Sequence, residues 1–236
     1  MLCEETRTRL IRGKLVILWL NLFLGLAGCE GSSDQRAQQA DTVIVAVGDS
    51  LTWGSLAFGK RASQKGYPAM LETKLRAAGY EIVVLNKGIP GEKSPETALR
   101  FQQAIEGADL VLLMIGTNDI IKPETCPDPH NCRTIEQIDA MLEQALDAGV
   151  IPLLSTLPPA QGRCARSWAN PIIDALNTEI QQVAQARNVT LVDTHQAILE
   201  HGGGVLFSDC LHFTDDGYGI IAQEWYHALL PLLSEE

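Results

Sequence analysis

The chain has 236 residues and a formal net charge of -11, with 46% hydrophobic and 20% charged residues. This length allows one domain or a small pair, and the composition excludes disordered, collagen-like and coiled-coil chains. Because no Lys/Arg run lies outside the extreme N-terminus, the chain lacks the main source of affinity for nucleic-acid phosphate, and we expect no nucleic-acid partner.

Residues 1–28 are predicted to be a signal peptide. Basic residues precede an apolar run at residues 15–26, which is shorter than the roughly 20 residues that span a bilayer as a helix. The run leads into Leu26-Ala-Gly-Cys29, which resembles a bacterial lipobox and implies lipidation of Cys29 and cleavage just before it. A plain signal peptide, or a short membrane anchor with a chance cysteine, is the alternative.

Residues 29–40 are predicted to be a flexible tether, because the sequence EGSSDQRAQQA after the cysteine is polar, small and aperiodic. Residues 41–236 are then the folded domain. Attachment through two or more acyl chains would hold this domain stably in the bacterial cell envelope, where the periplasmic face of a membrane is the expected location.

From residue 41 the chain alternates short β-branched runs with longer helical patterns, which is typical of a parallel sheet with helices on both faces. Nearly continuous apolar runs such as VIVAV and LVLLMI suit strands that are buried on both sides. Strands are predicted at residues 42–47, 81–85, 109–115, 150–155 and 189–193.

Helix start and stop signals lie between these strands. The hydroxyl of Ser94 is predicted to cap a helix ahead of a proline, and Thr134 is predicted to open a capping box in a helix that Gly149 ends. A further helix is predicted to open at Asn170. The last helix is predicted from about Asp215, with acidic residues favourably placed in its first turn.

Four polar clusters follow the predicted strands, at the edge where open parallel sheets bind ligands. They are GDSL at residues 48–51, NKGIPG at 86–91, GTND at 116–119 and DCLH at 209–212. Each cluster alone is equally typical of a turn, a cap or a surface histidine. Their shared edge predicts a single site.

The residue types in these clusters fit acyl transfer, which needs a nucleophile, a base, an orienting carboxylate and donors for the oxyanion. Ser50 is the predicted nucleophile and His212 the predicted base, because an imidazole can accept and return a proton near neutral pH. Asp209 would orient the imidazole. The backbone N–H groups of Ser50 and Gly88 and the side-chain amide of Asn118 are the predicted oxyanion donors.

Taken together, GDSLTWG, NKGIPG, GTND and DCLHF resemble the four blocks of the SGNH (GDSL) hydrolases, in the order of that family, over residues 42 to about 233. The resemblance implies a flavodoxin-like, three-layer α/β/α sandwich with a five-stranded parallel sheet. It also implies esterase, lipase, thioesterase or carbohydrate O-deacetylase activity without a cofactor. The matching positions are Ser50 for the nucleophile, Gly88 and Asn118 for the oxyanion, and Asp209 and His212 for the acid and base.

Four cysteines of the predicted domain are available for disulfides, as export of the chain permits. The close spacing of Cys126 and Cys132 favours a local bond, which leaves Cys164 to pair with Cys210 by default. The second bond would tie the loop after the fourth strand to the loop that carries His212. Four free thiols and a metal site are the alternatives, although neither CxxC spacing nor a paired-histidine spacing supports zinc.

The sequence also suggests roles for residues next to the motifs. Asp49 is predicted to be a turn carboxylate and Asp119 a cap. The aromatic residues Trp53, Phe213 and Tyr218 are candidates for the acyl or leaving-group pocket, and ordinary packing is the alternative for each of them.

The sequence therefore predicts a lipid-anchored, monomeric serine esterase that acts on small carboxylic esters, lysophospholipids or thioesters through an acyl-Ser50 intermediate. No cofactor and no metal are expected. One alternative is a non-catalytic surface lipoprotein with the same fold, since a fold does not determine function. Another is a metal-dependent hydrolase in which His195 and His201 join Asp209 and His212.

Overall fold

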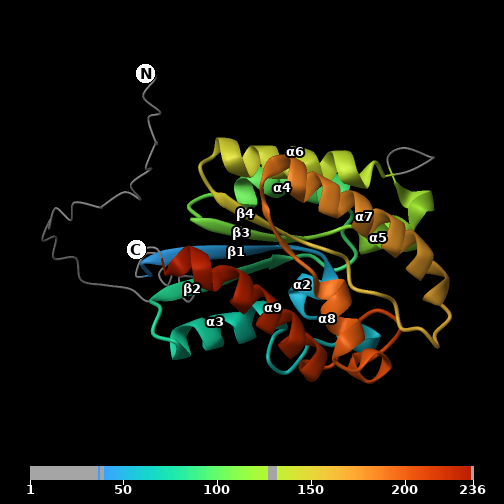
Figure 1. The fold of residues 1–236 in the computed structure, drawn as a ribbon. Helices are drawn as coiled ribbons and strands as arrows, with labels where there is room; N and C mark the ends of the chain where they lie inside the picture. The colour runs from blue at the N-terminus through green and yellow to red at the C-terminus, as the bar shows by residue number, and fades with distance from the viewer. Residues whose placement is uncertain (1–36, 38–39, 127–131, 235–236) are drawn as a thin grey trace, which may run out of the picture. The chain divides into compact units, whose positions relative to one another are not determined.

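The structure, a computed structural model, describes residue 37 and residues 40–126 and 132–234. At its centre lies a five-stranded sheet in which all neighbouring strands are parallel, in the order β2-β1-β3-β4-β5 (Figure 1). The predicted α/β class and parallel sheet are thereby confirmed. The strands are β1 (Thr42–Gly48), β2 (Ile82–Gly88), β3 (Leu110–Met114), β4 (Ile151–Ser155) and β5 (Thr190–Val192).

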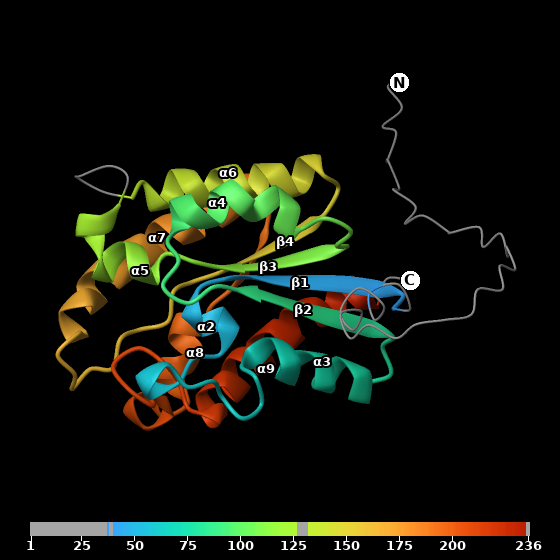
Figure 2. The same cartoon turned by 180° about the vertical axis from the view of Figure 1, so that it is seen from behind.

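Helices cover both faces of this sheet, as the two opposite views show (Figures 1 and 2). One face carries α4 (Ser94–Ala104), α5 (Thr117–Ile121), α6 (Thr134–Asp147) and α7 (Asn170–Arg187). The other face carries α2 (Ser50–Trp53), α3 (Tyr67–Ala77), α8 (Thr194–Glu200) and α9 (Asp215–Leu233). The three-layer sandwich that the family resemblance implied is confirmed.

The side chains of β1 alternate between the two hydrophobic layers. Val43, Val45 and Val47 pack into the layer that contains α4, α6 and α7, whereas Ile44 and Ala46 pack into the layer that contains α3 and α9. Because both faces of the strand are buried, the strand has a continuous apolar sequence instead of an alternating one.

The last helix, α9, begins where the sequence predicts and supplies the largest buried side chain. The Thr214 hydroxyl caps it by accepting the Gly217 N–H at 3.3 Å. Trp225 is fully buried against Tyr67, with ring centroids 6.1 Å apart. The helix is thereby fixed to α3 beneath the sheet.

The starts of α4 and α6 differ from the prediction in the residue at the cap and in the group to which the predicted capping hydroxyl bonds. The cap of α4 is Lys93, not Ser94, and α6 is preceded by Arg133, so the capping box predicted from Thr134 does not form. Both hydroxyls donate to the carboxylate of Asp119 instead, that of Thr134 at 2.9 Å. Hydrogen bonds to Asp119, which is distant in sequence, have replaced the two predicted local capping bonds.

The predicted signal peptide and Cys29 lie outside the described residues, as does most of the predicted tether. Within the described part of the chain, no helix combines the length and the apolar character needed to cross a bilayer.

Candidate active site

Ser50 is placed at the carboxyl edge of the sheet by a sharp turn from β1 into α2. The side chain of Asp49 caps this short helix by accepting the Leu51 N–H at 2.9 Å. The turn packs tightly against β3, because a Cβ on Gly48 would lie 2.2 Å from the carbonyl oxygen of Met114. Ser50 is therefore presented by a rigid, close-packed backbone.

His212 lies on a loop just before α9 that is closed by a bridge between Phe207 and Phe213. Inside the loop, Asp209 Oδ1 accepts the backbone N–H groups of Leu211 and His212, each at 2.8 Å. These bonds form a tight turn that holds the carboxylate beside the imidazole three residues later.

The three residues predicted to act together meet at hydrogen-bonding distance. His212 Nε2 lies 3.0 Å from Ser50 Oγ, and His212 Nδ1 lies 2.7 Å from Asp209 Oδ2. Burial alone would raise the pKa of Asp209, but bonds from the imidazole and from two backbone N–H groups outweigh it and lower that pKa below its usual value. Asp209 thus stays ionised and acts as an acceptor for the imidazole N–H.

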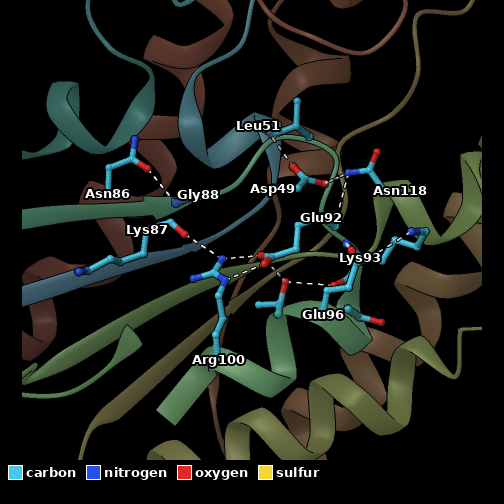
Figure 3. A network of polar contacts seen from close by, with 12 residues as sticks. Asp49, Leu51, Asn86, Lys87, Gly88, Glu92, Lys93, Glu96, Arg100 and Asn118 are labelled. Atoms are coloured by element: carbon cyan, nitrogen blue, oxygen red, sulfur yellow. Dashed lines mark hydrogen bonds and ion pairs between the residues drawn. The ribbon is translucent and has the colours of Figure 1, made fainter. Parts of the chain in front are cut away.

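The side chain of Asn118, a predicted oxyanion donor, has both of its amide hydrogens directed at protein acceptors (Figure 3). Asn118 Nδ2 donates to Asp49 Oδ2 at 3.1 Å and to the carbonyl oxygen of Glu92 at 3.0 Å. The amide is thereby held in one orientation next to the site. An oxyanion in the site would have to share or displace one of these hydrogen bonds.

The other two predicted oxyanion donors differ in whether their backbone N–H already has an acceptor. The N–H of Gly88 donates to Asn86 Oδ1 at 3.0 Å (Figure 3), whereas the N–H of Ser50 has no acceptor among the described residues. A Cβ on Gly88 would lie 2.3 Å from the backbone nitrogen of Trp53. Glycine is therefore required here because α2 packs directly on β2.

Asp49, predicted to be a simple turn carboxylate, has a second role because its other oxygen holds Asn118. Its side chain is buried, and no cation from the described part of the chain pairs with it. The pKa of Asp49 is raised to about 7, mainly by burial and also by the nearby carboxylates of Asp119 and Glu92, against the lowering effect of the Leu51 N–H.

A buried ion pair supports the loop that carries the Glu92 carbonyl. Arg100 Nε donates to Glu92 Oε1 at 2.7 Å, and the Thr97 hydroxyl donates to Glu92 Oε2 at 2.8 Å. Arg100 also donates to the carbonyl oxygen of Lys87 at 2.9 Å, beside the end of β2 (Figure 3). One guanidinium thus connects both ends of the loop between β2 and α4.

A cavity of about 290 Å³ opens beside Ser50. Its lining comes from all four motif regions and from two cationic side chains, and includes Ser50, Pro90, Asn118, Lys122, Arg166 and His212. The predicted residues Ser50, Asn118 and His212 therefore share one cavity, and Gly88 is absent from its lining.

The aromatic candidates are not part of this cavity. Phe213 and Tyr218 are fully buried, and the Tyr218 hydroxyl donates to the carbonyl oxygen of Ser55 at 2.6 Å. Trp53 lies under the guanidinium of Arg61, 4.7 Å from ring centroid to Cζ. Packing is thus the role of Phe213 and Tyr218, the alternative that the sequence left open.

His195 and His201 do not join His212 in one cluster. His195 Nδ1 lies 2.9 Å from Asn177 Nδ2 and 3.0 Å from the carbonyl oxygen of Leu157, and His201 Nδ1 lies 2.9 Å from the carbonyl oxygen of Ala197. Among the residues with described positions, no group of three or more His, Cys, Asp or Glu side chains is arranged to hold a metal ion.

Two disulfides join the cysteine pairs that the sequence predicted. Cys126 is bonded to Cys132 with a Cα–Cα distance of 4.9 Å, and Cys164 to Cys210 with a Cα–Cα distance of 5.5 Å. The second bond ties the loop after β4 to the loop of His212, two residues from the imidazole. The predicted connection between these loops is confirmed.

Lys122 and Arg166 are charged residues of the cavity lining that were not predicted from the sequence. A weak signal existed for each of them. Lys122 follows Asn118 by four residues, which is one helical turn, and Arg166 follows Cys164 by two residues. Neither position belongs to a motif, so only the fold brings them to the cavity.

The sequence model of the GDSL-like Lipase/Acylhydrolase family matches residues 46–220. Among curated proteins, the chain is 28% identical over 226 residues to "Uncharacterized lipoprotein YqeF" of Bacillus subtilis (strain 168), covering 83% of this chain and 85% of that protein. It is 25% identical over 129 residues to an arylesterase of Vibrio mimicus, covering 54% and 61%.

Solved structures share the fold. A variant of the acetyl xylan esterase Axe2 from Geobacillus stearothermophilus matches with a TM-score of 0.68 at 22% identity, covering 81% of this chain and 96% of that chain. The lipase/acylhydrolase from Enterococcus faecalis matches with a TM-score of 0.67 at 24% identity, covering 80% and 95%.

Proposed function

Because the chain belongs to the GDSL-like lipase/acylhydrolase family of carboxylic ester hydrolases, we propose that it hydrolyses small esters through an acyl intermediate on Ser50. The observation that carries this proposal is the continuous line of hydrogen bonds from Ser50 Oγ through His212 to Asp209, at 3.0 and 2.7 Å. Nucleophile, base and orienting carboxylate are the parts that acyl transfer requires.

In the first step, Ser50 Oγ attacks the ester carbonyl carbon while His212 Nε2 takes the hydroxyl proton. The imidazolium that forms is stabilised by Asp209, which accepts its Nδ1–H. The tetrahedral intermediate then collapses, and His212 returns the proton to the departing alcohol. Water attacks the acyl-Ser50 ester in the second step, with His212 again acting as base and then as acid.

Negative charge on the tetrahedral oxygen needs preorganised donors. The Ser50 N–H is a donor that has no acceptor among the described residues, and Asn118 lies in the cavity lining. We assign Gly88 as the third donor on the family resemblance alone, because its N–H is bonded to Asn86. For Asn118 and Gly88, donation to the oxyanion requires sharing or releasing an existing bond.

Short acyl and acetyl esters suit the site better than long-chain substrates. The cavity of about 290 Å³ lies at the low end of the roughly 300–1,000 Å³ of small-molecule sites. A solved structure with the same fold is named an acetyl xylan esterase, and a sequence relative is named an arylesterase. Lysophospholipids and thioesters remain within the proposed substrate class.

We also propose that the protein is exported and anchored by lipid at Cys29, after removal of residues 1–28. A relative that is itself named a lipoprotein and two disulfides in the domain support export. Labelling of cells with radioactive palmitate tests this proposal. Label should enter the wild-type protein and not the Cys29→Ala variant, and equal labelling would contradict the anchor.

The catalytic proposal is tested with short para-nitrophenyl esters and a soluble form that begins after Cys29. The Ser50→Ala variant should lose about 10⁴-fold or more in kcat, because removing a triad nucleophile leaves only binding and oxyanion stabilisation. Ser234→Ala is the matched control, since this serine lies at the far end of α9. Full turnover by Ser50→Ala would end the assignment.

A further inference from the structure

Two cationic side chains in the cavity have no counterion. Lys122 and Arg166 both line the cavity beside Ser50. Within the described part of the chain, neither side chain makes an ion pair or a hydrogen bond. Other arginines of the domain, such as Arg100 and Arg187, are paired with carboxylates. Among the described cations without a printed partner, which include Arg163, Lys122 and Arg166 are set apart by lining the cavity beside Ser50.

The cavity contains no acidic side chain among its described lining residues. Three carboxylates next to residues of this lining already have partners. Asp209 accepts from His212, Asp49 is buried and holds Asn118, and Glu92 pairs with Arg100. In a chain with a formal net charge of -11, an uncompensated positive cavity is unusual and is suited to an anionic ligand.

Lys122 stands on the side of the cavity that carries the oxyanion donors. It is the C-cap residue of α5, and its N–H donates to the carbonyl oxygen of Asn118 at 3.0 Å. Its Nζ lies over the loop after β2, since a Cβ on Gly91 would be 3.6 Å from that atom. The ammonium thus lies close to Gly91, which also lines the cavity.

Arg166 is held on the His212 side. It follows Cys164 by two residues, and Cys164 is bonded to Cys210, which precedes His212 by two residues. The carbonyl oxygen of Arg166 accepts the N–H of Ala169 at 3.0 Å, at the start of a short 3-10 helix (Ser167–Ala169). A covalent bond and a turn therefore fix the backbone of Arg166 near the base.

We propose that the substrate is an ester that carries an anionic group, a phosphate or a carboxylate, and that Lys122 and Arg166 bind this group. The inference rests on the proposed esterase function and names the substrate class of that site. A guanidinium binds either anion through paired N–H donors, and an ammonium adds a second point charge. Because both side chains are partly exposed, each contributes a moderate factor to kcat/KM and not an absolute requirement.

The test compares neutral esters with matched esters that carry an anionic group. Butyrylglycerol and butyrylglycerol phosphate place the anion on the alcohol, whereas para-nitrophenyl butyrate and para-nitrophenyl hemisuccinate compare a neutral with an anionic acyl group. Wild-type protein should prefer the anionic member of at least one pair by about tenfold in kcat/KM at low salt. This preference should shrink at high salt, because ions screen exposed charges.

The variants Lys122→Gln and Arg166→Gln should each reduce the ratio of kcat/KM for the preferred anionic ester to kcat/KM for the neutral ester about fivefold. Arg163→Gln is the matched control, since it removes the same charge from the same loop and Arg163 does not line this cavity. The pair that responds identifies whether the anion lies on the alcohol or on the acyl group. Thermal melting confirms that each variant is folded.

Failure of this proposal is distinguishable from failure of the proposed function. Hydrolysis of neutral and anionic esters at equal kcat/KM, with no change of their ratio in Lys122→Gln and Arg166→Gln, overturns the anionic substrate and leaves the esterase intact. Absence of hydrolysis of every ester by wild-type protein overturns both.

Discussion

Asn118 Nδ2 donates to Asp49 Oδ2 across 3.1 Å, in a buried contact that links the segment after β3 to the segment after β1. Asp49 is the residue before Ser50, so the carboxylate that caps the nucleophile's helix also orients the amide beside it. The position of the proposed nucleophile and the orientation of a proposed oxyanion donor therefore depend on one side chain.

This carboxylate should make the protein less stable as pH rises. Its pKa is raised from 3.8 to about 7 in the folded protein, so the folded state disfavours the charged form. The free energy of unfolding should fall between about pH 4 and pH 7, by about 1.4 kcal/mol for each pKa unit of the shift. Asp49→Asn removes this dependence. Urea unfolding at pH 5 and pH 8 should show the variant gaining stability relative to wild type at pH 8, and an equal difference at both values would refute the assignment.

The same contact predicts a graded loss of activity. Asn118→Ala should lower kcat about 10²- to 10³-fold, the usual effect of losing one oxyanion donor. Asp49→Asn keeps the donor and loses an acceptor that orients it, so we expect a drop in kcat of about tenfold with little change in KM. Steady-state kinetics on a short ester checks both values. An Asn118→Ala variant with wild-type kcat would remove this amide from the mechanism.

The two disulfides should differ in both stability and activity. The bond from Cys164 to Cys210 closes a sequence separation of 46 residues and that from Cys126 to Cys132 closes 6, which gives about 4 and about 2 kcal/mol from chain entropy. Paired Cys→Ser variants, measured by chemical unfolding, test this order. Only loss of the first bond should also lower kcat, because that bond holds the loop of His212. An equal effect on kcat from both pairs would contradict this role.

Gly88 should be intolerant of any side chain. A Cβ there would meet the backbone nitrogen of Trp53 at 2.3 Å, so Gly88→Ala should lower the free energy of unfolding by about 1–3 kcal/mol. Gly219 lies within α9 with open space around it, and Gly219→Ala should raise stability by up to about 1 kcal/mol. Thermal unfolding distinguishes the two signs. A fully stable Gly88→Ala protein would show that α2 can move away from β2.

The fold was predictable because burial on both faces gives β1 and β3 nearly continuous apolar runs, and the motif residues all follow strands at one edge. Helix caps were less predictable. Ser94 and Thr134 carry the hydroxyls that local rules place at caps, yet both bond to Asp119, which lies 25 and 15 residues away in sequence. A buried carboxylate that needs donors outweighed the local preference, and sequence spacing does not reveal such a contact.

The proposed catalytic residues followed from the sequence better than the proposed substrate contacts did. Ser50, Asp209 and His212 have neighbours that mark them, and the structure brings them together as expected. Lys122 and Arg166 reach the cavity only through the turn of α5 and through a disulfide. Residues that recognise a substrate depend on loop geometry, which a single sequence does not specify.

The most direct test of an acyl-serine mechanism is the mass of the intact protein after treatment with a fluorophosphonate, followed by peptide mapping. One adduct should form, on Ser50, and it should be absent from Ser50→Ala and form far more slowly in His212→Ala. An adduct of the same mass and rate in Ser50→Ala would show that the 3.0 Å contact between Ser50 Oγ and His212 Nε2 is not the reacting pair.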